Sequence, residues 1–97
     1  MSYPIFWSDE AVKNLEAILS YLSVKWSEKE VMKFKSRLAE QLTIVSKFPT
    51  VFPASPSVPR LRKAVLTRQT IIFYEFRDQQ IFIAYLFDSR KNPDKIT

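Results

Sequence analysis

Four basic residues in the second half of the chain have the types and spacing needed to bind an anion. Arg60, Arg62 and Lys63 lie within four positions, and Arg68 follows in a predicted turn. A guanidinium group binds phosphate or carboxylate through paired hydrogen bonds, whereas a lysine acts as a compact point charge. Three cations this close on one strand repel one another unless an anion relieves them. We therefore expect these residues to contact an anionic partner.

The positive charge of the chain is concentrated around these residues. Residues 1–57 hold 7 basic and 6 acidic side chains, whereas residues 58–97 hold 8 basic and 4 acidic ones. The second segment thus contributes most of the net charge of +5. A basic surface suits nucleic acid, a ribosome or an acidic polypeptide as partner, although a soluble charged surface without a partner has the same composition.

The composition also excludes several kinds of chemistry. The chain has no histidine, the side chain that most often transfers protons near neutral pH. It has no cysteine, which removes disulfides, thiolate metal sites and thiol nucleophiles. It has no glycine, and therefore no glycine-rich phosphate loop. We accordingly expect no cofactor and no metal site, and any catalysis must use other groups.

The cations belong to a segment that is predicted to form an antiparallel sheet. Residues 59–88 contain three runs rich in β-branched and aromatic side chains, separated by short polar connections at 67–68 and 77–79. Connections this short allow only antiparallel neighbours. The second and third runs are apolar on both faces, so one face of the sheet is either covered or offered to a partner. Simple alternation puts Ile81, Ile83, Tyr85 and Phe87 on one face of the last run, and Phe82, Ala84 and Leu86 on the other.

Two amphipathic helices are predicted to cover one face of this sheet. The first follows an N-cap at Ser8 and ends near Ser23, and the second begins at a capping box over residues 27–30 and runs for about 21 residues to Pro49. A loop of about four residues joins them into a hairpin, and Trp26 in that loop is expected to fill its open end. The apolar stripes are Ala11, Leu15, Ile18, Leu19 and Leu22, then Val31, Phe34, Leu38, Leu42, Val45 and Phe48.

The remaining segments complete a single domain, residues 1–97. Residues 3–7 predict a short edge strand, because Pro4 cannot donate to a ladder. Residues 49–59 contain four prolines and predict an extended connector, and residues 89–95 predict a loop or ragged end. The order is strand, helix, helix and three strands, an α+β fold. No apolar run is long enough to span a membrane and no secretory signal is recognisable, so we expect a cytoplasmic protein.

Several short features follow one another along nearly the whole chain. They include Trp7-Ser8 before the first helix, Phe48-Pro49 after the second, Arg62-Lys63, and Asp88-Ser89-Arg90 beyond the last strand. In this order they resemble the RelE/ParE superfamily of toxins from type II toxin–antitoxin modules, also known as plasmid stabilisation proteins. The resemblance implies a small, antiparallel-rich β-sheet packed against an N-terminal helical hairpin. It also implies growth inhibition by the free toxin and a cognate antitoxin as partner, and it leaves a homodimer open.

The superfamily has two activities, which require different residues. Members similar to RelE cleave mRNA on the ribosome, and members similar to ParE poison DNA gyrase. Cleavage needs a base, an acid and cations around the phosphorus atom. The candidates for binding the target or a phosphate are Arg60, Arg62, Lys63, Arg68 and Arg90. Weaker acid or base candidates, for which core packing or a solvated surface is the plainer explanation, are Tyr74, Tyr85, Glu75 and Asp88.

The C-terminal segment favours the ParE-like activity. Ribonuclease members commonly carry a tyrosine or histidine after the arginine that corresponds to Arg90, whereas residues 91–97 contain neither. The expected target is therefore DNA gyrase, with ribosome-dependent mRNA cleavage as the alternative. A third alternative is a non-toxic scaffold that binds an antitoxin. For Arg90 itself, an ion pair with Asp88 is the structural alternative to a functional role.

Overall fold

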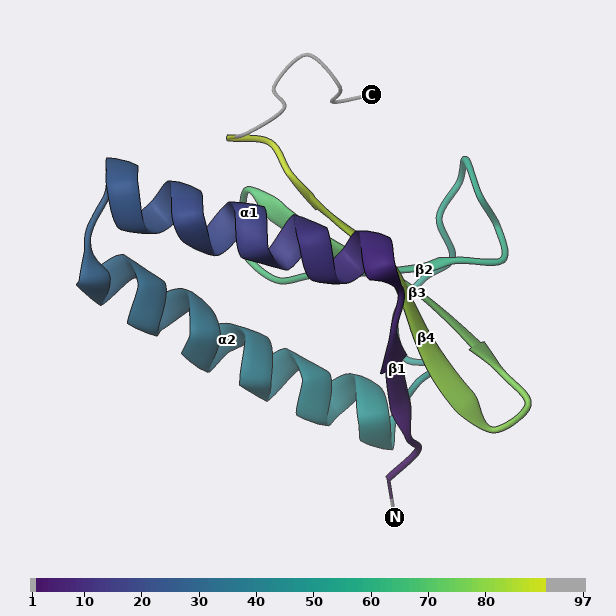
Figure 1. Cartoon of the computed structure of the whole chain (residues 1–97). Coiled ribbons are helices and arrows are strands. Elements are labelled where there is room, and N and C mark those ends of the chain that lie inside the picture. Colours follow the sequence, from purple (N-terminus) through teal and green to yellow (C-terminus); the bar gives the residue numbers. More distant parts are fainter. Residues whose placement is uncertain (1, 91–97) are drawn as a thin grey trace.

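The computed structural model describes residues 2–90 and contains the predicted order of one strand, two helices and three strands. Figure 1 shows both helices on the same side of the sheet. The predicted C-terminal loop lies, from residue 91 onward, outside the described residues. No helix within the described part is both long and apolar enough to cross a membrane. The elements are β1 (Ile5–Trp7), α1 (Asp9–Lys25), α2 (Glu28–Lys47), β2 (Arg62–Val65), β3 (Thr70–Arg77) and β4 (Gln80–Asp88).

The four strands form one sheet in the order β1-β4-β3-β2. The pairs β2–β3 and β3–β4 are antiparallel, as the short connections predict, whereas β1 pairs with β4 in parallel. β1 is an edge strand, as Pro4 indicates, and the two strands that are apolar on both faces lie inside the sheet. The predicted α+β class with an antiparallel-rich sheet is confirmed.

The hydrophobic core lies between the helices and one face of the sheet. The stripes of the two helices pack there, with Ile18, Leu22, Phe34 and Val45 buried. The side chains of the opposite face, which we call the open face, are only half-buried, because no described element covers them. The core face of the sheet consists of Ala64, Ile72, Tyr74, Ile81, Ile83 and Leu86, and the open face includes Ile71, Phe73, Phe82, Tyr85 and Phe87.

A β-bulge in β4 explains this division and corrects the alternation predicted from the sequence. Phe73 pairs with Tyr85, but the next residue, Tyr74, pairs with Ile83, so Ala84 has no partner opposite. One extra residue reverses the order of the faces for the rest of the strand. Tyr85 therefore moves to the open face and the residue after it, Leu86, points to the core, contrary to the prediction.

Side chains of α1 hold the backbone at this bulge. The Ser8 hydroxyl donates to the carbonyl of Ala84 at 2.6 Å, and the Asn14 side-chain oxygen accepts from the N–H of Leu86 at 3.0 Å. Ser8 also caps α1 as predicted, because its oxygen accepts from the N–H of Ala11 at 2.9 Å. One serine thus fixes both the start of a helix and the register of the neighbouring strand.

Three predictions about the ends of the helices are wrong. α1 continues to Lys25, two residues past its predicted end, so only Trp26 and Ser27 connect the helices. Trp26 becomes the C-cap at the tip of the hairpin and is 57% exposed, instead of filling the core. Phe48 is 61% exposed, because as the C-cap of α2 it leaves the helical periodicity that defines the buried stripe.

Replacing Ser8 by alanine is expected to lower the free energy of unfolding by about 1–3 kcal/mol. The loss combines a helix cap with a partly buried hydrogen bond to the bulge. Ser27→Ala is the matched control, since Ser27 caps α2 at an exposed position with a 3.3 Å hydrogen bond from the N–H of Glu30. That variant should lose only about 0.5–1 kcal/mol. Urea denaturation measures both, and equal losses would contradict the role assigned to Ser8 at the bulge.

Candidate functional site

The predicted cations on and before β2 differ in what they contact. Arg62 donates through Nη1 to the backbone carbonyls of Thr50 at 3.2 Å and Phe52 at 2.6 Å. These oxygens relieve the charge repulsion expected in this cluster and tie the connector to the sheet. Lys63 lies on the open face, and Arg60 is exposed in the connector. Arg62 is therefore engaged inside the protein, whereas Lys63 and Arg60 can reach a partner.

Asp88, at the end of β4, is buried and orients Arg90. Its carboxylate accepts from Nε of Arg90 at 3.1 Å, from Nη2 at 2.8 Å, and from the hydroxyl of Thr70 at 2.6 Å. Burial alone would raise the pKa of Asp88, but the hydrogen bonds from Arg90 and Thr70 bring it below its ordinary value. The hydrogen bonds to Asp88 raise the pKa of Arg90. Both groups consequently stay charged, and the guanidinium is fixed along one edge.

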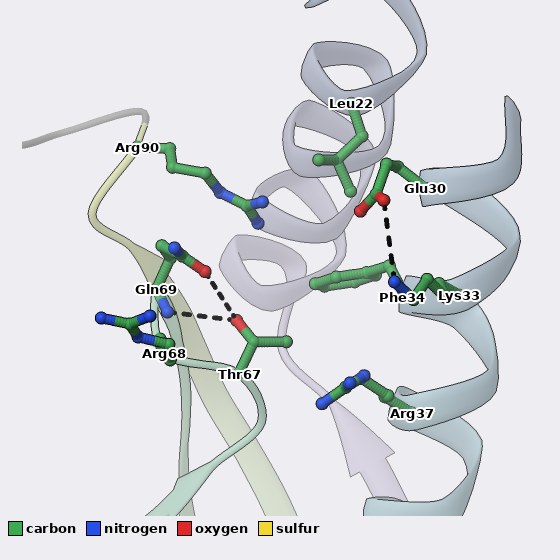
Figure 2. Close-up of a pocket in the computed structure, with 9 residues that line it drawn as sticks. All are labelled: Leu22, Glu30, Lys33, Phe34, Arg37, Thr67, Arg68, Gln69 and Arg90. Atoms are coloured by element: carbon green, nitrogen blue, oxygen red, sulfur yellow. Dashed lines mark hydrogen bonds and ion pairs between the residues drawn. The ribbon is translucent and has the colours of Figure 1, made fainter. Parts of the chain in front are cut away.

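Arg90 borders a cleft between the helices and the loop that joins β2 to β3 (Figure 2). This helix–sheet cleft has a volume of about 200 Å³. Leu22 and Phe34 supply its apolar wall, and both are buried. The other lining residues are polar or charged: Glu30, Lys33, Arg37, Thr67, Arg68, Gln69 and Arg90. The structure thus brings Arg68 and Arg90 together, and sets them apart from the cations of β2.

Sequence reasoning missed two cations of this cleft, Lys33 and Arg37. They are four positions apart on α2, hence on one side of the helix, and they flank the buried Phe34. That spacing beside an apolar stripe was a usable signal for a basic helix edge. It did not reveal that Arg68 and Arg90 would lie opposite, because their approach depends on the packing of the helix against the sheet.

Two of the acid or base candidates have their polar atoms engaged within the protein. Tyr74 is fully buried, and its hydroxyl donates to the carbonyl of Pro49 at 2.6 Å. Burial raises the pKa of Tyr74 to about 12. Asp88 is saturated by the hydrogen bonds from Arg90 and Thr70. This placement favours structural roles for Tyr74 and Asp88.

The other two candidates, Glu75 and Tyr85, lie on the open face. Glu75 pairs with Arg77, whose Nε is 3.4 Å from its carboxylate. Tyr85 stacks on Phe73 with ring centroids 4.6 Å apart. The cleft is on the helix side of the sheet, so these candidates and the cleft cations face opposite ways. Within residues 2–90, no three or more Asp or Glu side chains gather where they could hold a metal ion.

The open face carries several aromatic side chains that contact one another. Besides the stacked Phe73 and Tyr85, Phe6 and Phe82 stack with ring centroids 5.6 Å apart. The guanidinium carbon of Arg77 lies 4.3 Å from the centre of the Phe82 ring, a cation–π contact. Half-buried aromatic rings on a sheet face that no described element covers form a surface suited to a protein partner.

A comparison with protein families matches this chain over residues 5–93 to the family described as ParE toxin of the type II toxin–antitoxin system parDE. No curated protein matches the chain in sequence at a significant level. The family match covers both helices, all four strands and Arg90.

Several solved structures share the fold. A chain of the chromosomal ParDE system from P. aeruginosa superimposes with a TM-score of 0.74 at 19% identity, covering 90% of this chain and 96% of that one. The E. coli DinJ–YafQ toxin–antitoxin complex gives 0.64 at 12% identity, covering 95% and 98%. A mutant of the E. coli toxin RelE in the free state gives 0.62 at 14% identity, covering 96% and 90%. At these identities the likeness shows a common fold.

Replacing Asp88 by asparagine is expected to lower the free energy of unfolding at pH 7 by about 1.5–3 kcal/mol, the range for hydrogen bonds to charged groups. The pKa of Asp88 is lowered in the folded state, so its stabilisation is complete above the unfolded pKa of about 3.9 and is lost as the pH falls through the folded pKa. Urea denaturation from pH 7 down to about pH 2 should show the parent and the variant converging in acid. A gap that stays constant over this range would contradict a charged Asp88.

Proposed function

Because the chain belongs to the ParE toxin family of type II toxin–antitoxin systems, we propose that it arrests growth when free and is neutralised by a cognate antitoxin in the cytoplasm. We propose DNA gyrase as its target, because the resemblance to ParE-like members of the superfamily implies inhibition of gyrase. The observation that carries the proposal is the family match over residues 5–93.

The side chains of the described residues support a toxin that acts by binding. An inhibitor of this kind needs no general acid or base. The chain has no histidine, and the polar atoms of Tyr74 and Asp88 are engaged inside the protein. Glu75 and Tyr85 remain on the open face, where they pair with neighbouring side chains. The available cations bind anions without further chemistry.

Ribosome-dependent mRNA cleavage is the second candidate function, and the helix–sheet cleft is the observation that favours it. Arg68 and Arg90 in this cleft are suited to stabilise the negative charge that develops when a 2′-hydroxyl attacks a phosphate. The reaction would also need proton transfer. Glu30 lies in the cleft but is paired with Lys33 at 3.8 Å, and the predicted candidates Glu75 and Tyr85 lie on the opposite face of the sheet. This separation is the reason for preferring gyrase.

We propose that the antitoxin covers the open face. The stacked rings of Phe73 and Tyr85, and those of Phe6 and Phe82, give this face a half-buried apolar surface. Lys63 adds a cation beside them, and the net charge of +5 favours an acidic partner. A segment that folds on this face would add a layer opposite the helices.

Expression of the chain alone is expected to arrest growth, and the purified protein to inhibit supercoiling by gyrase or to trap a cleaved DNA complex. Ribosome-bound mRNA should stay largely intact, since neither Glu75 nor Tyr85 lies in the cleft and the loss of general acid–base catalysis typically costs ~10²–10⁴ in rate. Supercoiling assays and primer extension on translated mRNA measure the two outcomes side by side.

A triple variant tests whether cations carry the toxicity. It replaces Arg60, Lys63 and Arg68 by glutamine, because their side chains make no hydrogen bond or ion pair within residues 2–90. Arg62 and Arg90 are kept, because they bond to the connector and to Asp88 and their loss would disturb the fold. The variant should remain folded and lose toxicity. Strong cuts in the ribosomal A site with normal supercoiling would contradict gyrase as target, and a parent chain without any toxicity would favour the antitoxin-binding scaffold.

A further inference from the structure

The helix–sheet cleft holds more positive charge than its own acidic residues balance. Lys33 has Glu30 as a partner at 3.8 Å, and Arg90 has Asp88. Arg37 and Arg68 line the same cleft and have no ionic partner among residues 2–90. Two uncompensated guanidinium groups beside an apolar wall favour an anion from outside the described chain.

Arg90 is preorganised to take part in such binding. Its Nε and Nη2 donate to Asp88, so the guanidinium is held along one edge, and Nη1 has no hydrogen-bond partner within the described residues. Figure 2 shows Arg90 and Arg37 pointing toward the same hollow from opposite walls. A donor that is already fixed loses little conformational entropy when an anion binds.

The size and walls of the cleft favour a side chain over a nucleic acid. Its volume of about 200 Å³ is below the ~300 Å³ lower bound typical of small-molecule sites. Phe34 is only 3% exposed, so its ring cannot act as the stacking platform on which single-stranded nucleic acids depend. The carboxylate of Glu30 in the wall, which is paired with Lys33 at 3.8 Å, would repel a run of phosphates more strongly than a single carboxylate.

We propose that the helix–sheet cleft binds one carboxylate side chain of an acidic peptide segment, with Arg37 and Arg90 facing the carboxylate and Arg68 at the edge of the cleft. The inference rests on the proposed function, in which the antitoxin is the partner that supplies the segment. It adds a second contact region to the open face, on the other side of the sheet.

The probe is the peptide acetyl-Leu-Glu-Leu-amide, titrated into ¹⁵N-labelled protein while the arginine Nε–H resonances are followed by NMR. The signals of Arg37, Arg68 and Arg90 should shift together, with at least about tenfold weaker binding of acetyl-Leu-Gln-Leu-amide, because the charge-assisted hydrogen bonds are lost. A thymidine oligonucleotide is the third ligand titrated. If it bound these arginines more tightly than the glutamate peptide, the cleft would be a nucleic-acid site and the proposal would be overturned.

Two double variants that lose the same amount of charge distinguish binding in the cleft from non-specific attraction to the positive net charge. Arg37→Gln with Arg68→Gln should weaken the glutamate peptide at least about tenfold, whereas Lys13→Gln with Lys47→Gln, both exposed and outside the cleft, should change its affinity less than about twofold. Equal losses in both, or no shift in the parent, would overturn the proposal. The titration does not depend on toxicity. Failure of peptide binding with growth arrest intact would overturn only the cleft proposal, and peptide binding without growth arrest would overturn only the proposed toxicity.

Discussion

The β-bulge at Ala84 determines which side chains of β4 meet the helices and which meet the surroundings. With one residue left unpaired, Leu86 and Asp88 join the core face. Ser8, the N-cap of α1, and Asn14 within α1 hold the backbone at Ala84 and at Leu86, at 2.6 Å and 3.0 Å. The register of β4 and the position of α1 against the sheet therefore depend on the same hydrogen bonds.

Both surfaces with a proposed role follow from this arrangement. On the core side, the buried Asp88 fixes the guanidinium of Arg90 at the border of the helix–sheet cleft. On the other side, Tyr85 comes to lie against Phe73, and no element within residues 2–90 covers the aromatic open face. The helices and the sheet already close the core, and an apolar sheet face left open beside them is the kind of surface on which partner chains bind. The central claim is that the antitoxin covers this face.

The elements themselves could be predicted from the sequence, because they depend on local patterns. Ser8 as a helix cap, the apolar stripes and the short strand connections all act over a few residues. The bulge could not be predicted, because residues 81–87 are apolar at every position and fit either register. The cleft depends on α2 meeting a loop some thirty residues later in the chain, which no local pattern records. The prediction that Trp26 fills the core fails for a related reason, because the exposure of Trp26 depends on where α1 ends.

Hydroxyl-radical footprinting of the chain, alone and in complex with the antitoxin that co-purifies with it, tests the central claim most directly. Phe73 and Tyr85 should lose most of their reactivity in the complex, because the partner covers the open face. Trp26, at the exposed tip of the helical hairpin, should stay as reactive as in the free chain. A stable complex in which Phe73 and Tyr85 react as they do in the free protein would contradict the account.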